Sequence, residues 1–427
     1  MKSYNFIVVG NGLMGSAAGR YLSDWSDSVA VIGSSEPTDH SQHVGVFSSH
    51  YDQGRLTREL AQDPIWSFMS RRAVKKYEIL EERSKVDFHG AVGRVHANNP
   101  TADERRDLLD WLEQASQETG TEYRYFEKGD RSWKKLFPYL DFPEDYDLFY
   151  EPGPAGYINP RSMLQAQNVI AQQQGADVYD ERVVNIASTA DGVTVTTDSG
   201  NRFTADKVLV ACGAFTNFSN LLPQPIPLKL KTESMAWGEV DEETAVSLQS
   251  CPGIGYNIDD PDIDDIYMAP PILYPDGTYK IKLGCNTKGE LWPETLEELQ
   301  VWFQSGPSEA DLPPMAQAMQ RVFPDVTFTR ITSHRCIVTY TPSGYPTIDR
   351  APGDENGRLY VATGGNGSGA AGSDTLGHVA AGLVFDGRWP DDLPRQPFLA
   401  TNSWGGSTKK LTKAQARAFA LETSENE

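Results

Sequence analysis

The chain has 427 residues, which is long enough for two domains with a sizeable core, and its hydrophobic content of 39% and charged content of 23% are ordinary for a globular enzyme. Its net charge of −21 opposes binding to nucleic acid or to an anionic membrane surface, because each partner would add like charge. No apolar stretch is long enough to span a bilayer. A single lysine precedes the first predicted strand, so we expect no signal peptide.

The four cysteines also limit the possible chemistry. They form no Cys-x-x-Cys pair, which argues against a disulfide framework and against a zinc site: Cys212, Cys251, Cys285 and Cys336. From this pattern we expect no metal centre, and a reducing, cytoplasmic location.

The first 32 residues predict a strand, a glycine turn, a helix and a second, parallel strand. The apolar run 6–9 is followed by Gly10, Gly12 and Gly15 at GxGxxG spacing, and the run 29–32 closes the unit. In such a unit the first glycine permits a tight turn, the second lets the backbone approach a pyrophosphate, and the third lets the helix pack on the strand. Because the helix start also offers free N–H groups to phosphates, this stretch favours a dinucleotide site.

An acidic residue usually ends the second strand of this unit and binds a ribose hydroxyl. Gly33 stands there instead and is followed by Ser34, Ser35 and Glu36. A serine hydroxyl or the Glu36 carboxylate could make the ribose contact in its place.

Apolar periodicity predicts the remaining elements. We expect helices at 65–80, 102–117, 161–173, 296–303 and 376–383, and strands at 88–95, 183–186, 193–197, 207–211, 279–283, 336–340 and 359–363. Between 125 and 160, aromatic, proline and acidic residues dominate, a composition more typical of core or of a domain interface than of a binding site.

Three further features have possible chemical roles. Arg55 and Arg58, at i and i+3 in the segment 50–58, are either a solvated helix start or two cations near an anionic ligand, and the residues alone favour neither. Lys282 lies in a predicted strand, where a lysine is usually solvent-facing. The glycine-rich loop 364–369 lies between an apolar strand and a helix, so its backbone N–H groups could stabilise negative charge such as that of a reduced flavin ring.

Taken together, these segments resemble the FAD-dependent amine oxidases of the D-amino-acid oxidase superfamily, and most closely the monomeric sarcosine oxidase branch. The resemblance runs from Tyr4 to about Leu383 and rests on four matches in the expected order. They are the first glycine turn, the segment 50–58 with its Arg-x-x-Arg ending, the triplet 282–284, and the segment 336–349 with its cysteine-to-aspartate spacing.

The resemblance implies an α/β fold with a Rossmann-like FAD-binding domain and a smaller, β-rich substrate domain. The FAD-binding domain would be discontinuous and comprise residues 1–90, 155–221 and 330–400. The substrate domain would comprise residues 91–154 and 222–329, and residues 401–427 would form a C-terminal surface tail.

The resemblance also implies roles for individual residues. Cys336 would bond covalently to the flavin, and Lys282 would lie beside the flavin and favour superoxide formation from oxygen. Arg55 would be a further catalytic cation, and Arg58 would face the substrate carboxylate. FAD would also contact the two glycine loops and the strands beside them: Gly10, Gly12, Leu13, Met14, Gly15, Ser34, Ser35, Arg55, Val183, Gly213, Gly364, Gly367, Ser368 and Gly369.

Departures from the resemblance bear on the substrate. Asn286 replaces a histidine of the sarcosine oxidase type, Ala371 replaces a lysine that holds the substrate carboxylate, and Gly365 and Ala370 replace bulky aromatic residues. We therefore expect a bulkier secondary amine or N-substituted amino acid, with sarcosine a poor substrate. The expected pocket is lined by Arg58, Tyr267, Asn286, Gly365 and Ala371.

The implied activity is FAD-dependent oxidation of a C–N bond to an imine, which water hydrolyses, with release of hydrogen peroxide by a monomeric enzyme. The alternatives are a dehydrogenase of the same fold with a quinone or protein acceptor, and a flavin-binding protein without turnover. Lys282, Arg58 and Cys336 argue against the second, because a non-catalytic binder has no chemical need for all three. An NAD-dependent enzyme would leave the second glycine loop and Cys336 unexplained.

Overall fold

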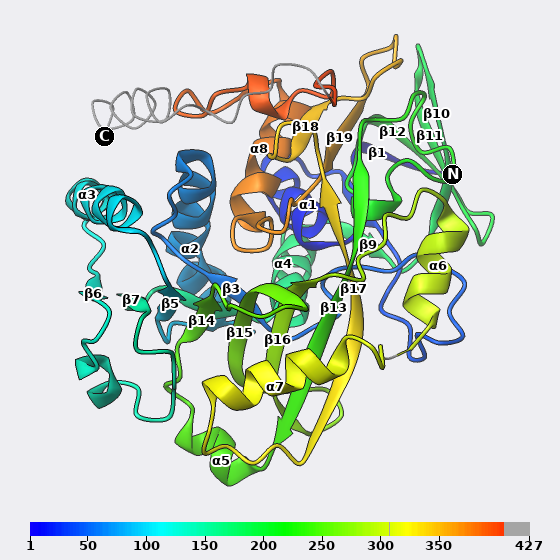
Figure 1. The fold of residues 1–427 in the computed structure, drawn as a ribbon. Helices are drawn as coiled ribbons and strands as arrows, with labels where there is room; N and C mark the ends of the chain where they lie inside the picture. The colour runs from blue at the N-terminus through cyan, green and yellow to red at the C-terminus, as the bar shows by residue number, and fades with distance from the viewer. Residues whose placement is uncertain (307, 405–427) are drawn as a thin grey trace.

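The protein, in a computed structural model that describes residues 1–306 and 308–404, is organised around two large sheets (Figure 1). The first sheet, in the upper part of that view, has the order β10-β11-β12-β1-β2-β9, with β19 beside β12 and β18 beside β19. Its strands are β1 (Lys2–Val9), β2 (Val29–Ile32), β9 (Asp177–Tyr179), β10 (Val183–Thr189), β11 (Gly192–Thr197), β12 (Arg202–Val210), β18 (Thr347–Arg350) and β19 (Leu359–Thr363).

Four helices belong to this half of the molecule: α1 (Leu13–Trp25), α2 (Pro64–Ser84), α4 (Pro160–Gln173) and α8 (Ser373–Phe385). Helices α1 and α8 approach closely, because a Cβ on Gly377 would clash with Ala17. A buried ion pair between Arg20 of α1 and Asp374 of α8, 2.8 Å apart, fixes their relative position, and Gln167 of α4 donates to the same carboxylate. The parallel core of β9, β2, β1, β12 and β19 is thus a Rossmann-like layer.

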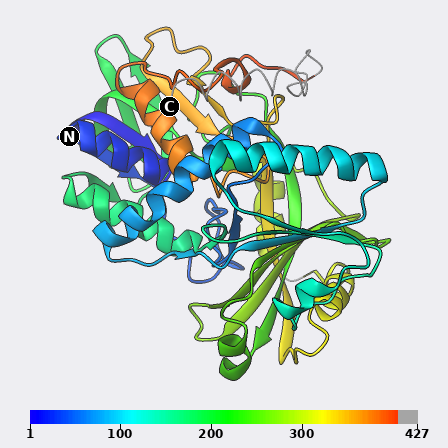
Figure 2. The ribbon, with the colours of Figure 1, turned by 90° about the vertical axis from the view of Figure 1, so that its left-hand side faces the viewer.

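The second sheet has the order β17-β13-β16-β15-β14-β5-β7-β6 and lies below the first in Figure 1. Its strands are β5 (Arg94–Asn98), β6 (Arg124–Phe126), β7 (Asp147–Glu151), β13 (Lys229–Val240), β14 (Gly253–Tyr256), β15 (Ile263–Leu273), β16 (Tyr279–Thr287) and β17 (Arg330–Tyr340). The helices of this half are α3 (Ala102–Thr119), which extends across the view of Figure 2, α5 (Glu242–Ser247), α6 (Leu296–Gln304) and α7 (Leu312–Val322).

A third, three-stranded sheet of order β3-β8-β4 contains β3 (Arg55–Thr57), β4 (His89–Gly90) and β8 (Gly156–Ile158). Short 3-10 turns lie at Ser132–Lys135, Gly213–Phe215 and Gln396–Phe398. Strand β3 also contacts β14 and β15, which places the segment 50–58 against the second sheet.

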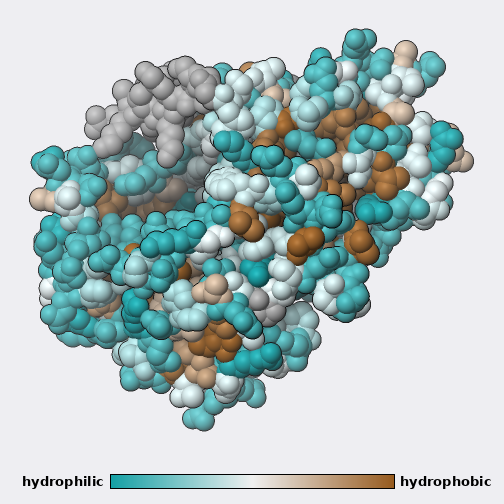
Figure 3. Space-filling model, turned by 45° about the vertical axis from the view of Figure 1, so that its right-hand side comes forward, coloured by the Kyte–Doolittle hydropathy of each residue, from teal (hydrophilic) through white to brown (hydrophobic). Residues whose placement is uncertain are grey.

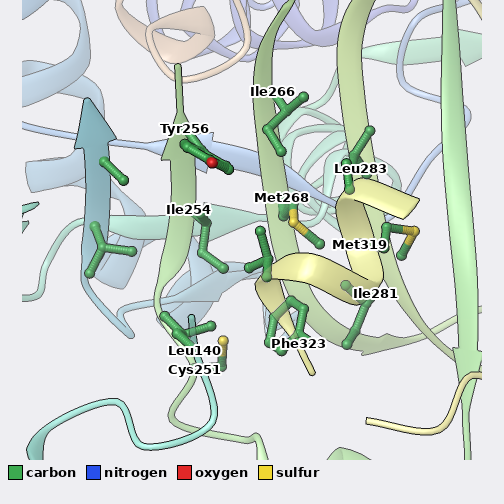
Figure 4. Close-up of a cluster of buried hydrophobic side chains, with 14 of the residues drawn as sticks. Leu140, Cys251, Ile254, Tyr256, Ile266, Met268, Ile281, Leu283, Met319 and Phe323 are labelled. Atoms are coloured by element: carbon green, nitrogen blue, oxygen red, sulfur yellow. The ribbon is translucent and has the colours of Figure 1, made fainter. Parts of the chain in front are cut away.

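The two faces of the second sheet differ in chemistry. On one face apolar side chains such as Ile254, Met268, Ile281 and Leu283 pack together, and α7 covers them with Met319 (Figure 4). Successive side chains of a strand point to opposite faces, so the residues between these, including Lys282, point toward the other face. This face carries the candidate site.

The structure confirms the predicted α/β class and most predicted elements. The single strand expected at 88–95 is wrong: the chain forms β4 and β5 in two different sheets, with Gly93 at φ +81° between them. The predicted domain division stays a prediction, but β17, assigned above to the FAD-binding domain, pairs along its length with β13 of the second sheet. Most of the predicted tail, 405–427, lies outside the described residues.

The face of the molecule seen in Figure 3 is mainly hydrophilic, with apolar residues in separate patches. Exposed large apolar side chains include Val44, Leu291, Trp292 and Val301. Among the helices of the described residues, none is long and apolar enough to cross a membrane.

Candidate functional site

The first glycine turn has the predicted geometry. Gly10 has φ +105°, and a Cβ there would clash with Ala211, so only glycine fits. A Cβ on Gly15 would clash with the carbonyl of Gly10, which explains how closely α1 starts against the end of β1.

The start of α1 is open toward a ligand. No side chain of the described residues caps this helix at Gly12, and no described atom lies within 4 Å of the position of a Cβ on Gly12. The start of α1 is therefore uncapped and unobstructed at Gly12, which suits a phosphate, because the first N–H groups of a helix have no partner within the helix.

The second glycine loop lies against the first. A Cβ on Gly369 would approach the Met14 side chain to 3.2 Å, and Gly364 and Gly367 adopt positive φ. At the end of β19, Thr363 donates a 2.9 Å hydrogen bond to the carbonyl of Gly213, which follows β12. The predicted FAD-contact residues of the two glycine loops and Gly213 thus gather at the carboxyl ends of the parallel strands, where dinucleotides bind in such folds. Val183 instead begins the antiparallel strand β10, and Arg55 begins β3 in the third sheet.

The region beyond β2 is arranged differently from the usual ribose site. A Cβ on Gly33 would clash with the backbone of Asn11, which excludes a carboxylate at that position. Glu36 binds Arg161 through both oxygens at 2.6 Å, and the backbone N–H of Ser35 donates to Asp180. Glu36 keeps its charge, because Arg161 and His40 hold the pKa of this carboxyl at about 2 despite partial burial.

The centre of the candidate site is a buried carboxylate between two cations. Asp52 forms ion pairs with Arg55 and with Lys282, whose Nζ lies 2.5 Å from Oδ2 of Asp52 and donates to the carbonyl of Gly54 at 2.9 Å. The Lys282 side chain is only 1% exposed, so the solvent-facing orientation typical of a strand lysine is wrong here. The solvated reading of Arg55 is wrong for the same reason, because its side chain is 14% exposed.

Burial and charge set the protonation of this triad. The cations Lys282 and Arg55 hold the pKa of Asp52 well below its ordinary value, so it stays ionised in spite of its burial. Burial, and then the charge of Arg55, lower the pKa of Lys282 from its ordinary value of 10.5, while Asp52 opposes that shift. Lys282 is therefore the member of the triad that can lose its proton most easily.

Two further predicted residues adjoin the triad. The ring of Tyr267 lies 4.9 Å from Nζ of Lys282 and rests on Gly284, where a Cβ would clash with it. Cys336 is buried in β17 and shares a cavity with Arg55. Burial raises the pKa of its thiol.

The remaining pocket residues are more dispersed. Asn286, on the same strand as Lys282, accepts a 2.6 Å hydrogen bond from Lys231, which also pairs with Glu290. Ala371 lies against α2, since its carbonyl accepts a 2.7 Å hydrogen bond from Tyr77.

Sequence reasoning missed several charged residues of this face. Asp52 lies inside the motif 50–58, and its place three residues before Arg55 was the available signal. Glu233 lies directly opposite Cys336 in the sheet, and burial raises the pKa of its carboxyl group. Strand alternation from Lys231 to Glu233 would have placed both on one face.

Comparison with known proteins agrees with this arrangement. The family model described as FAD dependent oxidoreductase (DAO) matches residues 5–383, which is most of the chain. The chain belongs to this family.

Two curated relatives match this family member over nearly its whole length. A monomeric sarcosine oxidase of Streptomyces avermitilis is 25% identical over 399 residues, covering 90% of this chain and 94% of that protein. An N-methyl-L-tryptophan oxidase of Yersinia pestis is 24% identical over 394 residues, covering 91% and 97%. Among solved structures, NikD, an unusual amino acid oxidase essential for nikkomycin biosynthesis, has a TM-score of 0.72 and 18% identity, covers 93% of this chain and 98% of its own, and shows the same fold.

This FAD-dependent oxidoreductase has residues that fit its cofactor. The open backbone at Gly12 and the uncapped start of α1 suit a pyrophosphate. The second glycine loop also meets the strand that carries Cys336, since the N–H of Asn366 donates to the carbonyl of Thr339 in β17. Within residues 1–306 and 308–404, no group of three or more His, Cys, Asp or Glu side chains could hold a metal ion.

The open position of Gly12 gives a prediction that separates FAD binding from folding. In Gly12→Ala the new methyl group meets no described atom, and the φ of −93° suits alanine, so the thermal stability of the flavin-free protein should not change. The methyl group would occupy the pyrophosphate position, so we expect FAD affinity to fall at least tenfold, about 1.4 kcal/mol. Titration of FAD in a Cys336→Ser background measures it.

Gly289→Ala is the matched control, because a Cβ there makes only an ordinary 3.6 Å contact with Asp311. Equal FAD affinity in Gly12→Ala and in this control would show that the pyrophosphate does not pass Gly12.

Proposed function

We propose that this protein oxidises the C–N bond of a secondary amine or N-substituted amino acid bulkier than sarcosine, and passes the electrons to oxygen. The observation that carries the proposal is the buried Lys282, held beside Tyr267 by Asp52 on the sheet face that also bears Cys336. A lysine is rarely buried, and one that burial and specific charged partners perturb is a candidate functional group, here a cation that could act beside the cofactor of this family.

The reaction removes a hydride equivalent and a proton from the substrate. FAD, when bound, accepts the hydride equivalent. The product is an imine, which water hydrolyses to a carbonyl compound and an amine, and oxygen takes up two electrons and two protons to give hydrogen peroxide. A neutral substrate amine needs no side-chain general base for this chemistry.

The residues of this chain orient the substrate and stabilise the negative charge that develops on oxygen. Lys282 presents a fixed positive charge in a site screened from water, where it stabilises developing negative charge on oxygen more than it would in bulk solvent. Tyr267 packs on this cation and limits its movement. Arg58 would bind the substrate carboxylate, and Cys336 would carry the covalent bond to the flavin.

The names of the two relatives span a wide range of substrate size, from sarcosine to N-methyl-L-tryptophan. Small residues at Gly365, Ala370 and Ala371 support the larger end of that range for this chain. The four cysteines are free thiols, which fits the proposed cytoplasmic location. The proposed monomeric state rests on the likeness to the monomeric sarcosine oxidases.

A graded substrate panel tests the proposed function. Under anaerobic conditions a substrate should bleach the flavin absorbance, and in air it should release hydrogen peroxide. We expect N-methyl amino acids with large side chains to have a kcat/KM at least tenfold above that of sarcosine. The highest kcat/KM for sarcosine would refute the large pocket, and bleaching without peroxide release would favour a dehydrogenase.

Covalent flavin attachment is tested by acid precipitation. Yellow colour should remain with the precipitated wild-type protein and be lost to the supernatant in Cys336→Ser. Cys285→Ser is the control, because Cys285 is buried in the apolar core on the opposite face of the second sheet. Wild-type protein that releases all its colour on precipitation would exclude the bond.

Lys282→Met tests the oxygen step. Anaerobic flavin reduction should stay largely intact, while reoxidation by oxygen should slow by ~100-fold or more because the cation is lost. Burial lowers the pKa of Lys282 to about 8, so its charge is present at neutral pH and is lost as the pH rises through that value. Reoxidation of the wild type should therefore slow in alkaline solution, whereas reoxidation of the variant should not change with pH in this range.

The matched control is Lys280→Met, on the same strand, since Lys280 pairs with Asp276 rather than with Asp52. If Lys282→Met and Lys280→Met reoxidise at the same rate as wild type, Lys282 has only a structural role.

A further inference from the structure

Two arginines on the site side of the second sheet have unsatisfied buried groups. The Nε atoms of Arg58 and Arg94 are inaccessible to solvent, and neither has a hydrogen-bond partner within residues 1–306 and 308–404. Across the same ranges, neither guanidinium lies within ion-pair distance of a carboxylate. Buried donors and charges are normally paired, so this arrangement indicates a missing anionic partner.

Backbone contacts bring the two arginines together although they are 36 positions apart. Glu151 of β7 lies directly opposite Arg94 of β5. Its Oε1 accepts hydrogen bonds from the backbone N–H of Glu59 at 2.6 Å and of Leu60 at 3.2 Å, the two residues that follow Arg58. The Glu151 side chain therefore links the strand beside Arg94 to the two residues that follow Arg58.

Strand β14, on the other side of Arg94, also lets the segment that carries Arg58 come close to the sheet. Gly253 of β14 pairs with Arg94, and a Cβ there would clash with Leu56 of β3. The absence of a side chain at 253 lets β3 lie across this part of the sheet, which brings Arg58 over the strand next to Arg94.

His96 contacts the guanidinium of Arg94 and Glu151 lies opposite Arg94 in the sheet, but neither forms an ion pair with it. Nδ1 of His96 lies 3.4 Å from a terminal nitrogen of Arg94, and the His96 ring rests on Gly255. Burial and the charges of Arg94 and Arg58 lower the pKa of His96 to about 3, so the ring is neutral and accepts. Burial raises the pKa of Glu151 to about 7, and its Oε2 has no partner in the described chain.

We propose that Arg58 and Arg94 together bind the carboxylate of the substrate, with Arg94 as the second cation that Ala371 does not supply. This inference rests on the proposed function for the identity of the substrate, an amino acid rather than a simple amine. Guanidinium groups bind carboxylates through paired, charge-assisted hydrogen bonds, and an anion between the two arginines would relieve their mutual repulsion.

The position of Arg94 also bears on substrate length. Lys282 of β16 pairs with Ala269 of β15, and in the next strand, β14, Gly253 pairs with Arg94 of β5. Arg94 therefore lies three strands from Lys282, or about 14 Å between backbones. A carboxylate bound on the β5 side is displaced from Lys282, which suits a substrate longer than sarcosine.

The experiment compares two substrates in two variants of the holoenzyme. The substrates are an N-methyl amino acid oxidised by the wild type and the matched N-methyl amine without the carboxylate. In Arg94→Gln we expect the KM of the amino acid to rise about 10- to 100-fold with kcat nearly unchanged, and the KM of the amine to stay the same. Arg94→Lys, which keeps the charge, should recover part of the loss.

Arg124→Gln is the control, since Arg124 is an exposed residue of β6 in the same sheet. An equal effect of Arg94→Gln on both substrates, or no effect on either, would overturn the proposal. If Arg94→Gln does not fold, the Arg94→Lys variant and the wild type decide.

A binding measurement separates this proposal from the proposed function. Acetate and the neutral acetamide are titrated into the wild-type holoenzyme and into Arg94→Lys, and the flavin absorbance change reports binding. Tighter binding of acetate that weakens in Arg94→Lys would support the carboxylate site even if no amine were oxidised. Equal affinity for acetate and acetamide in the wild type would overturn the site while leaving amine oxidation intact.

Discussion

The site depends on one buried ion pair that joins distant parts of the chain. Asp52 lies between β2 and β3 and Lys282 lies in β16, yet their charged atoms are 2.5 Å apart and both side chains are 1% exposed. Removing one partner of such a pair typically costs about 3–5 kcal/mol, because the other charge is left buried. The position of the Lys282 side chain therefore depends on the segment that carries Asp52. Arg55 also binds Asp52, which keeps this carboxylate ionised and in place.

Glycines at three positions of the site face leave room for larger side chains to pack directly on the sheet. At Gly284 and Gly255 the missing side chains let the rings of Tyr267 and His96 lie flat on the sheet, and at Gly253 the same absence admits Leu56. Aromatic rings laid on a sheet have little freedom to rotate, so the cations that contact them, Lys282 and Arg94, are held in defined positions.

The sequence was sufficient for local structure and insufficient for long-range pairing. GxGxxG spacing and apolar periodicity located β1, α1 and α8, because these signals depend on residues a few positions apart. The orientation of Lys282 was not predictable, because alternation in β16 defines two faces without indicating which one another segment covers. Arg94 was missed because a single strand was expected at 88–95, whereas Gly93 breaks the chain into two strands and starts β5 at Arg94 itself.

Positive charge is distributed unevenly along this face of the second sheet. Near Cys336 the cations Arg55 and Lys282 share Asp52, which leaves one positive charge, whereas at the β5 end the two cations Arg58 and Arg94 have no ion pair with a carboxylate of the described residues. The net charge of −21 on the whole chain does not offset this difference, because salt screens surface charges beyond about 8 Å. If the proposed carboxylate site is correct, a substrate with a neutral amine and a carboxylate would enter with its carboxylate toward β5 and its C–N bond toward Lys282.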